Sequence, residues 1–355
     1  MTKRVYIGPS NIANFSDHLE KSLTANGVKA DFITWSYLVH PFQYGKKKNF
    51  KLFYKPPFKI FGKNIFFNVN EYFLKPLYFF YLLIKYDIFL FIKPTTIFRN
   101  NIDLKILRLF NKKIGMFNLG CADRNINFDS DPEYVCNTCT DIIKQKLFFC
   151  NNIDKKKEQI YSFERYANYI FGPPDTVSYV KDKNKLHKYL MPMPIIKIKA
   201  KDKNFNGRLR ISHLPSNPLI KGTHIIEPVL KRLAEEEDIV IVIKKEMWSR
   251  EQILEELKNA HIIIDSLAGY IFGTLSLEAI QYGCVVLNAY PDWIAKYYEI
   301  PPIVKVNGVT LYATLKELIN NRDLMTKYAK RSQEAYNKYL SYKSAGEYYK
   351  EVLGL

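Results

Sequence analysis

Apolar residues recur along the chain with two periods, which predicts strands that alternate with helices. Short apolar runs, at 4–7 and 86–92, predict buried strands. Phe15, Leu19 and Leu23 recur every four residues and predict a helix that ends before Gly27. In the first third, the predicted elements are strands 4–7, 29–34, 86–92 and 113–118, and helices 14–26 and 70–84. This βα alternation predicts a parallel sheet with helices on both faces.

A second alternating unit begins near Leu209. Ser249 followed by Gln252 matches a capping box at the start of a helix. The predicted elements are strands 209–213, 239–243, 262–265 and 285–287, helices 223–234, 249–259 and 276–282, and a helical tail 324–355 broken near 341–344. The pattern therefore predicts an α/β protein with two Rossmann-like domains that face a cleft, joined by residues 181–203.

Length and charge narrow the classes of function. At about 150 residues per domain, the 355 residues again predict two domains. Hydrophobic residues are 47% and charged residues 25%, which is typical of a soluble globular chain. The 53 Lys and Arg exceed the 35 Asp and Glu, giving a formal charge of +18. Such a field favours anionic partners, namely nucleic acid, anionic lipid surfaces or phosphorylated small molecules.

No segment is predicted to cross a membrane or to direct secretion. The longest uninterrupted apolar run, 77–84, is far short of the about 20 residues that a spanning helix needs. Residues after Met1 show no signal-peptide pattern. The protein is therefore expected in the cytoplasm, where its five cysteines are reduced thiols or metal ligands rather than disulfides.

The segment 211–223 combines a strand end, a loop of small residues and Lys221-Gly222-Thr223 at the start of a helix. Backbone N–H groups at a helix start carry partial positive charge and suit a diphosphate, and Lys221 adds a full charge beside them. An ordinary βα turn with a surface lysine fits the same residues.

The segment 262–287 repeats the order strand, Gly-rich loop, helix start. Gly273, Thr274 and Leu275 lie where a second set of N–H groups would meet phosphate. Glu278 follows about one turn inside the helix, where a carboxylate could accept hydrogen bonds from ribose hydroxyls.

Together these segments resemble the C-terminal domain of the group 1 (family 4-like) glycosyltransferases of the GT-B fold. The residues that carry the resemblance are Pro215-Ser216-Asn217, Lys221-Gly222-Thr223, Asp265-Ser266-Leu267, Gly269, Gly273, Leu277-Glu278-Ala279 and Gly283. Weaker similarity covers Gly8 to Ala13, Leu119 to Arg124 and the interdomain 191–195. The resemblance implies an acceptor-side domain over 1–185, a nucleotide-sugar-binding domain over 186–335, and a C-terminal helix over 336–355 that crosses back to the first domain.

The resemblance also implies roles for individual residues. Lys221 neutralises the donor diphosphate, Gly273 to Leu275 offer backbone donors, and Glu278 holds the ribose. The loop from Gly8 to Asn11 approaches the donor or acceptor from the first domain. The predicted donor-binding set is Gly8, Asn11, His213, Ser216, Asn217, Gly222, Asp265, Tyr270, Gly273, Thr274 and Leu275.

Tyr270 is a departure from the family pattern. Many relatives have a glutamate eight positions before the residue that corresponds to Glu278, and this glutamate contacts the donor sugar. Here the position is Tyr270, so the sugar is held differently, through Asp265 or loop backbone, or the donor is unusual. A catalytically degenerate relative is a further alternative.

Sugar transfer needs a stabilised leaving diphosphate and an activated acceptor hydroxyl. The resemblance implies retention of configuration without an obligatory catalytic metal. Arg208 or Arg210 could add a second cation, or could be exposed strand-edge residues. Asp123 follows a strand end and could orient the acceptor or cap its own loop. His213 could contact the donor or could be a satisfied core residue.

Four of the five cysteines lie close together in the sequence. Cys136 and Cys139 have the CxxC spacing of a zinc knuckle, and Cys121 and Cys150 could complete a tetrahedral thiolate site. Structural zinc is the preferred interpretation, and four unrelated thiols or a redox pair are the alternatives. Cys284 is expected to pack in a helix-to-strand turn.

The leading hypothesis is transfer of a sugar from a nucleotide-sugar donor to a surface glycan or lipid-linked acceptor, as in bacterial polysaccharide synthesis. The basic, aromatic stretch at 46–63 is either a solvated loop or a contact with an anionic membrane surface. A nucleic-acid-binding protein would fit the charge, but no recognition motif accompanies it. A phosphosugar-metabolising Rossmann enzyme is disfavoured because no Gly-x-Gly-x-x-Gly follows the first strand.

Overall fold

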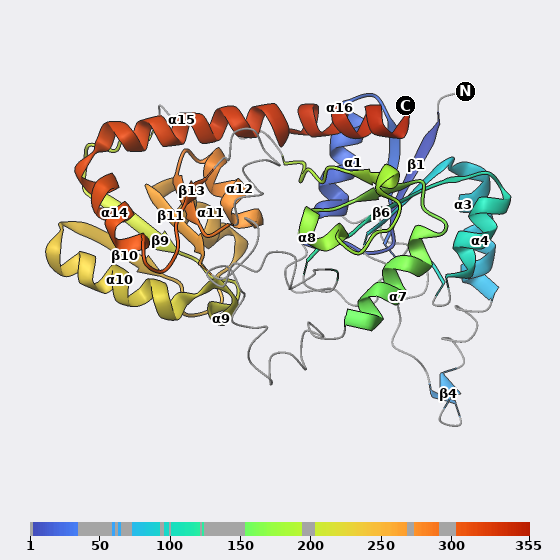
Figure 1. The fold of residues 1–355 in the computed structure, drawn as a ribbon, viewed down its shortest axis with the longest axis horizontal. Coiled ribbons are helices and arrows are strands. Elements are labelled where there is room, and N and C mark those ends of the chain that lie inside the picture. Colours follow the sequence, from blue (N-terminus) through green and yellow to red (C-terminus); the bar gives the residue numbers. More distant parts are fainter. Residues whose placement is uncertain are drawn as a thin grey trace. The chain divides into compact units, whose positions relative to one another are not determined.

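The computed structural model describes most of the chain in separate segments, which Figure 1 draws as a coloured ribbon. The described residues are 3–34, 59–60, 63–64, 73–92, 96–98, 101–120, 123, 153–193, 203–267, 273–290 and 303–355.

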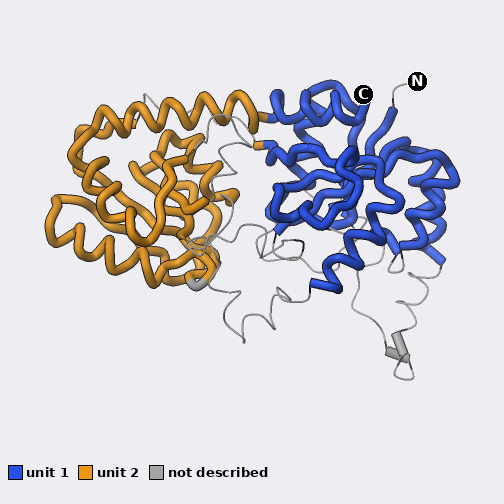
Figure 2. Tube along the Cα trace, in the orientation of Figure 1, with its two compact units in different colours: residues 1–125, 152–192, 342–355 blue, residues 126–151, 193–341 orange. Residues whose placement is uncertain are grey.

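These residues form two compact units, coloured separately in Figure 2. Unit 1 contains the described residues within 1–125, 152–192 and 342–355, and unit 2 those within 193–341. The chain thus passes from unit 1 to unit 2 after Pro192 and returns to unit 1 at Tyr342.

Unit 1 is built on a six-stranded, all-parallel sheet with the strand order β2-β1-β5-β6-β7-β8. Every residue of the apolar strand β5 is buried, as expected for a central parallel strand with both faces covered. The strand bounds are β1 (Arg4–Gly8), β2 (Lys29–Phe32), β5 (Ile88–Ile92), β6 (Lys113–Phe117), β7 (Tyr169–Phe171) and β8 (Leu186–His187). A separate antiparallel pair joins β3 (Lys59–Ile60) to β4 (Lys63–Asn64).

Helices cover both faces of this sheet. The chain moves in one direction along the sheet from β1 to β2 and in the other direction from β2 to β8, so right-handed crossovers place the two sets of helices on opposite faces. Side chains of α3, α4 and α7 share one apolar core, and α16 packs against α1. The helix bounds are α1 (Phe15–Ala25), α3 (Lys75–Lys85), α4 (Ile102–Leu109), α7 (Ile153–Glu164), α8 (Pro174–Val177) and α16 (Tyr342–Leu353).

At Gly346, α16 packs tightly against α1. A Cβ atom at this position would lie 2.3 Å from the Ser22 carbonyl oxygen and 2.2 Å from the Asn26 amide nitrogen. Both of these residues also hold the start of α16, because Ser22 Oγ and Asn26 Nδ2 donate to the Tyr342 carbonyl at 2.9 and 3.0 Å. Hydrogen bonds and close packing therefore fix the last helix on unit 1.

We expect Gly346→Ala to lower the stability of unit 1 by about 1–3 kcal/mol, because the added methyl group overlaps backbone atoms of α1. Urea unfolding followed by circular dichroism measures the loss. Gly207→Ala is the matched control, because no atom lies within 4 Å of the Cβ position there. Equal midpoints for the two variants would contradict the close packing of α16.

Unit 2 is built on a five-stranded, all-parallel sheet with the order β10-β9-β11-β12-β13. Its strands are β9 (Leu209–His213), β10 (Ile239–Ile243), β11 (Ile262–Ser266), β12 (Val285–Asn288) and β13 (Val304–Lys305). Its helices are α9 (Pro218–Lys221), α10 (Thr223–Glu236), α11 (Arg250–Asn259), α12 (Thr274–Gln281), α14 (Leu311–Asn320) and α15 (Arg322–Tyr339).

The structure confirms the predicted α/β class and its two Rossmann-like units. It also confirms the capping box of Ser249 and Gln252, and the break in the helical tail near Ser341. The sequence analysis did not predict α4, α7, α14, β7, β8 or β13. Strands β8 and β13 have two residues each, which is too short for a period to show. Strand β8 lies within the stretch expected to join the domains and instead forms an edge of the first sheet. Among the described helices, none is long and apolar enough to cross a membrane.

Candidate functional site

The topology of the second sheet singles out one place for a ligand. The chain runs from β9 to β10 in one direction and then returns to β11 on the other side of β9. In open parallel sheets, ligands bind beyond the carboxyl ends of the strands at such a switch point. Pairing of β9 with β11 extends only to Ser212 and Ile263, before either strand ends. Both predicted phosphate-binding segments begin at this switch point.

His213 occupies the space where the two strands stop pairing. Its Nδ1 lies 2.8 Å from the Ile264 carbonyl oxygen, and its Nε2 lies 2.8 Å from Thr223 Oγ1. A carbonyl can only accept, so Nδ1 carries the proton and Nε2 accepts from the hydroxyl. Burial lowers the pKa of His213, which keeps the ring neutral. The ring thus links β9, β11 and the start of α10, and its predicted contact with a donor stays a prediction.

Lys221 and Asp265 form an ion pair across the switch point. Lys221 is the last residue of α9, and its Nζ lies 2.6 Å from Asp265 Oδ1 at the end of β11. The aspartate side chain is fully buried, whereas 19% of the lysine side chain is exposed. An ammonium group has three hydrogen-bond donors, and the pair uses one of them. Lys221 can therefore present positive charge to a ligand while Asp265 holds it in place.

Asp265 also organises the start of α12. The register of β11 against β12 shifts between Ile264 and Ser266, and such a bulge re-aims the side chain within it. Asp265 Oδ2 accepts hydrogen bonds from Ser276 Oγ at 2.6 Å and from the Gly273 N–H at 3.3 Å. Burial opposes ionisation of Asp265, but the Lys221 charge and these hydrogen bonds outweigh it and lower its pKa. The carboxylate therefore positions both predicted phosphate-binding segments without being exposed itself.

Gly273 immediately precedes α12, with Thr274 and Leu275 as the first two helical residues. A Cβ atom at position 273 would lie 3.5 Å from Lys221 Nζ, which is ordinary contact rather than a clash. Glycine is thus not needed for packing, but a larger side chain would cover the ammonium group. The predicted backbone donors and Lys221 consequently lie next to each other.

Glu278 is held by an arginine that the sequence analysis did not single out. Arg250, the first residue of α11, donates two hydrogen bonds to Glu278, with nitrogen–oxygen distances of 2.7 and 2.5 Å. The glutamate side chain is 9% exposed and lies about one turn inside α12. A carboxylate has about four lone-pair sites, so two remain for other donors. This geometry fixes the orientation of the group predicted to bind ribose.

The loop after β9 is shaped by its own backbone. Asn217 begins the turn of α9, with its carbonyl accepting from the Lys221 N–H at 3.0 Å. Gly222 has a φ of 75°, a left-handed conformation that lets α10 start directly after α9. Ser216 is exposed. These residues place Lys221, and their direct contacts with a donor stay predictions.

In unit 1, Gly8 and Asn11 lie at the equivalent switch point, between β1 and β5. A Cβ atom at Gly8 would lie 2.3 Å from the Ile33 carbonyl oxygen, so only glycine fits beside β2. Asn11 Oδ1 accepts from the Ser16 N–H at 3.0 Å and holds the start of α1. These contacts fix the loop at the carboxyl end of β1, and its predicted approach to the donor or acceptor stays a prediction.

Asp123 closes the turn after β6. Its side chain is buried, and Oδ2 accepts from the Leu119 N–H at 2.9 Å. This contact agrees with the alternative in which Asp123 caps its own loop. Its proposed role in orienting the acceptor stays a prediction.

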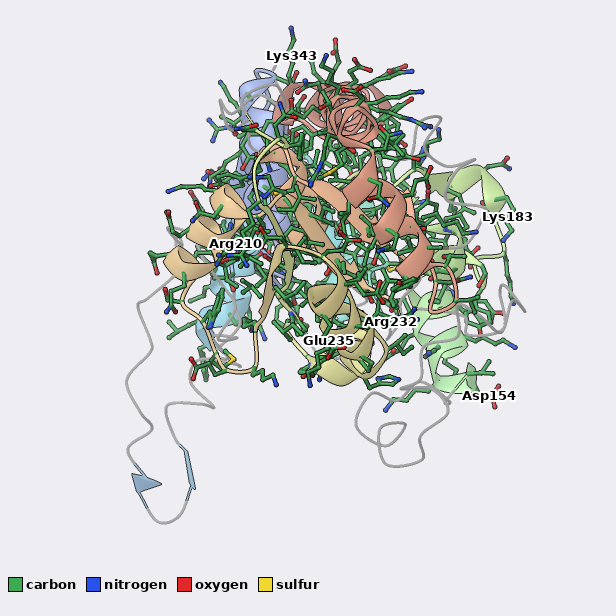
Figure 3. The ribbon with its side chains drawn as sticks, turned by 90° about the vertical axis from the view of Figure 1, so that its left-hand side faces the viewer. Asp154, Lys183, Arg210, Arg232, Glu235 and Lys343 are labelled. Carbon is green, nitrogen blue, oxygen red and sulfur yellow. The ribbon has the colours of Figure 1, made fainter. Side chains whose placement is uncertain are left out.

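Arg208 and Arg210 lie at the opposite, amino-terminal end of β9. Arg208 pairs with Asp238 at 2.8 Å. Arg210, which is labelled in Figure 3, forms a bidentate pair with the buried Glu256. The suggestion that either supplies a cation for the diphosphate is therefore wrong, because the strand direction carries both away from the switch point. Lys244, which follows β10 at the correct edge, is buried, and this burial lowers its pKa.

Several predicted residues lie outside the described part of the chain. They are Tyr270, Cys121, Cys136, Cys139 and Cys150. The zinc prediction consequently stays a prediction, which the zinc content of protein purified without chelator tests. Cys284 is described and buried, and its Sγ lies 3.3 and 3.2 Å from the Leu257 and Ala260 carbonyl oxygens, in agreement with its expected packing role.

The structure adds residues to the site that short motifs could not reveal. Ser276 donates a hydrogen bond to Asp265, and Arg250 donates to Glu278. The two members of each pair belong to different elements, so only the fold brings them together. Asn288, at the end of β12, is buried, and neither atom of its amide has a hydrogen-bond partner among the residues that the structure describes. No signal in the sequence marked these three positions.

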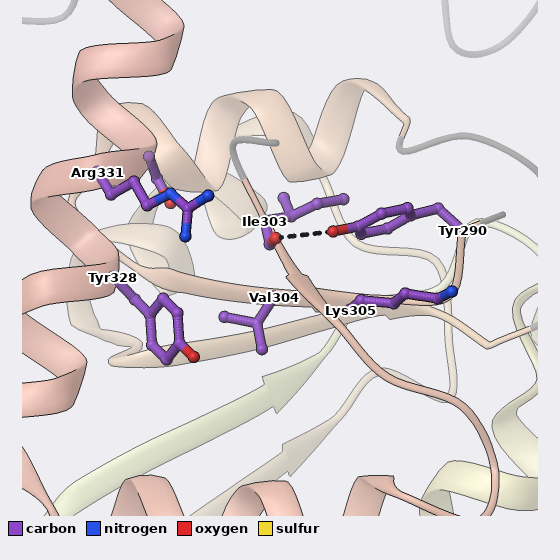
Figure 4. A pocket seen from close by; sticks show the side chains of 7 residues that line it. Tyr290, Ile303, Val304, Lys305, Tyr328 and Arg331 are labelled. Carbon is purple, nitrogen blue, oxygen red and sulfur yellow. Dashed lines mark hydrogen bonds between the residues drawn. The ribbon is translucent and has the colours of Figure 1, made fainter. Parts of the chain in front are cut away.

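A separate cavity of about 260 Å³ lies in unit 2 between the β12–β13 edge and α15 (Figure 4). Tyr290 and Lys305 line one side, and Tyr328 and Arg331 from α15 line the other. None of the predicted donor-binding residues contributes to this cavity.

Solved structures share the fold of this chain over its full length. Sucrose-phosphate synthase from Thermosynechococcus elongatus matches with a TM-score of 0.61 and 10% identity, covering 100% of both chains. An α,α-trehalose-phosphate synthase (UDP-forming) from Burkholderia xenovorans, in complex with glucose-6-phosphate, matches at 0.58 and 10%, covering 99% of both. A UDP-N-acetylglucosamine 2-epimerase matches at 0.54 and 12%, covering 99% of this chain and 95% of its own.

At these identities the similarity shows the fold, which is the two-domain GT-B fold. No protein-family model matches the chain, and no curated protein matches it by sequence. The structural matches include GT-B glycosyltransferases, in agreement with the resemblance that the sequence motifs indicated.

Proposed function

We propose that this protein is a glycosyltransferase that moves a sugar from a nucleotide-sugar donor to an acceptor hydroxyl. The observation that carries the proposal is the cluster at the switch point of the second sheet. There Lys221, the start of α12 and the Arg250-held Glu278 lie around one edge. Synthases that form sucrose phosphate and trehalose phosphate have the same fold, which supports this choice.

In the proposed reaction, the bond between the anomeric carbon and the donor diphosphate breaks, and a bond to the acceptor oxygen forms. The nucleoside diphosphate leaves with the bonding electron pair and takes up the proton of the acceptor hydroxyl. Lys221 and the N–H groups of Thr274 and Leu275 meet the negative charge that develops on the diphosphate. Glu278 accepts hydrogen bonds from the ribose hydroxyls.

The finer parts of the proposal follow from the family resemblance. The acceptor is a glycan or a lipid-linked sugar, the configuration is retained, and the diphosphate charge is met by protein groups without an obligatory metal. An epimerase that acts on a nucleotide sugar is the second candidate, because an enzyme of that class matches the fold over the whole chain. The two candidates share the donor site and differ in the need for an acceptor.

Thermal unfolding with a panel of UDP-, GDP-, ADP- and CMP-sugars tests the proposal. At 100 times the dissociation constant, a ligand stabilises its protein by about 2.7 kcal/mol, which corresponds to a shift of roughly 5 °C or more. One nucleotide class is expected to give such a shift. Release of the nucleoside diphosphate in the presence of acceptor glycans then measures transfer.

Each other outcome identifies an alternative. No shift with any nucleotide sugar contradicts the proposal. Change of the donor sugar without an acceptor, followed by nuclear magnetic resonance, indicates the epimerase. Binding without any turnover indicates a degenerate relative. A salt-sensitive complex with duplex DNA, in the absence of nucleotide-sugar binding, restores the nucleic-acid hypothesis.

A further inference from the structure

Helix α3 is a surface helix without a polar face. Its inner side packs Phe79, Leu82 and Leu83 into the core of unit 1. Its outer side has large apolar side chains at helical spacing, beginning just before the helix; these are Phe73, Leu77, Phe80, Tyr81 and Ile84. A surface helix of a globular protein normally has charged and polar residues on its outer side. The composition of α3 therefore indicates that something apolar covers it.

Helix α4 adds to the same surface. It lies on the same face of the sheet as α3 and shares its core. At its two ends it exposes further apolar side chains, which are Ile102, Leu109 and Phe110. Together the two helices and the residues that flank them carry eight of the ten large apolar side chains that are exposed in the described residues. Single exposed apolar residues are ordinary, but such a concentration marks a binding surface.

Basic side chains predominate around this apolar surface, although Lys85 pairs with Asp31 at 3.4 Å and the exposed Asp87 follows α3. Lys75 and Lys85 lie at the two ends of α3, and Lys105 and Arg108 are exposed on α4. The one carboxylate within these two helices, Asp103, is fully buried. Lys85 extends over the rings of Tyr81 and Tyr86, at 5.6 and 4.9 Å. The surface thus combines aromatic and aliphatic side chains with a basic rim.

An anionic bilayer surface matches this combination best. Interfacial helices bury an apolar face among lipid chains, while lysines and arginines reach the negatively charged headgroups. A symmetric pairing with a second copy would instead bring the exposed cations of each copy, Lys105 and Arg108, against those of the other. With 11 residues, α3 is about 16 Å long, so it suits the interface rather than a span of the about 30 Å hydrocarbon core.

We infer that the outer face of α3 and α4 docks unit 1 on an anionic membrane surface. This surface differs from the basic stretch at 46–63, which lies largely outside the described residues. The docking needs neither donor nor acceptor, so it stands or fails independently of the proposed sugar transfer.

Flotation with vesicles tests the inference on the full chain without any nucleotide. The vesicles contain phosphatidylcholine alone or with about 30% phosphatidylglycerol, a fraction that sets a negative surface potential like that of anionic leaflets. The wild-type protein is expected to float with the anionic vesicles. Leu77→Gln with Ile84→Gln is expected to weaken this binding at least about tenfold, because two apolar side chains no longer enter the lipid. Lys105→Gln with Arg108→Gln is expected to weaken it about fivefold for each charge removed.

Unit 2 offers closely matched controls. Met247 and Val309 have the same exposed fractions as Leu77 and Ile84, 67% and 85% respectively, so Met247→Gln with Val309→Gln removes equal apolar exposure elsewhere. Lys327→Gln with Lys330→Gln removes two exposed charges at the same i, i+3 spacing on α15. Both controls are expected to bind vesicles as the wild type does.

Three results would overturn the inference. The first is a wild-type protein that floats with neither kind of vesicle. The second is equal binding by the Leu77 and Ile84 variant and its control. The third is a dimer in solution that this variant converts to a monomer, which would show that a second copy covers the surface.

Discussion

Replacing Lys221 with methionine is expected to lower the stability of unit 2 by about 3 kcal/mol and to weaken binding of a nucleotide sugar about 10- to 100-fold. Methionine keeps the apolar stem but leaves the fully buried Asp265 carboxylate without its counter-charge. The second effect follows from the proposed function, since a charged hydrogen bond to the diphosphate contributes about 1.5–3 kcal/mol. Urea unfolding and nucleotide titration measure the two effects separately.

The double variant Lys221→Met with Asp265→Asn separates structure from binding. The amide oxygen introduced at position 265 can still accept hydrogen bonds from Ser276 and Gly273, and no buried charge remains. Most of the lost stability is therefore expected to return, while nucleotide binding stays weak. Recovery of both together would show that Lys221 only supports the fold.

The stability difference between Lys221→Met and the wild type is expected to shrink in acid. In the wild type, the lowered pKa of Asp265 means that its contribution is complete above about pH 4 and is lost below it. In the variant, burial without Lys221 raises the pKa of Asp265, so the variant loses stability as the pH rises from about 4. A difference that stays constant between pH 4 and 8 would contradict the ion pair.

Replacing Glu278 with alanine is expected to weaken binding of a ribonucleotide sugar about 10- to 100-fold. Under the proposed function, the carboxylate accepts charged hydrogen bonds from the ribose hydroxyls, and each is worth about 1.5–3 kcal/mol. The wild type is therefore expected to prefer a ribonucleoside diphosphate over its 2′-deoxy form, and Glu278→Ala is expected to bind the two equally. An unchanged preference in the variant would place the ribose elsewhere.

Glu256→Ala is the matched control for Glu278→Ala. Glu256 accepts a bidentate pair from Arg210, as Glu278 does from Arg250, and its side chain is similarly buried. Both substitutions are expected to cost about 1–3 kcal/mol of stability. Only Glu278 lies at the carboxyl edge of the sheet, so only its loss is expected to alter nucleotide binding.

The strands and helices that could be predicted from the sequence are those in which apolar side chains recur over several turns or residues. The apolar run at 88–92 and the pattern of Phe15, Leu19 and Leu23 are examples. Helix α4 and the two-residue strands β8 and β13 were not predicted, because they are too short for apolar positions to recur many times. Their conformation depends on neighbours that are distant in the sequence. Helix α3 was predicted, but the exposure of its apolar outer face appeared only in the tertiary structure.

The same division applies to the candidate site. Lys221, Gly273 and Glu278 could be found from the sequence because each belongs to a local strand–loop–helix segment whose backbone geometry has a chemical use. The ion pairs that hold Lys221 and Glu278 could not be found in this way. Asp265 reaches Lys221 across 44 positions, and Arg250 reaches Glu278 across 28.

The sequence alone determined the α/β class and the two Rossmann-like units, and it predicted the two phosphate-binding segments, because periodicity and helix starts are local properties. The tertiary structure decided which charges belong together. It assigned Arg210 to Glu256 and Arg250 to Glu278, and it placed Arg208 and Arg210 at the wrong end of β9 for a diphosphate. The physical reason is that an ion pair depends on distance in space, which parallel strand order sets and residue number does not.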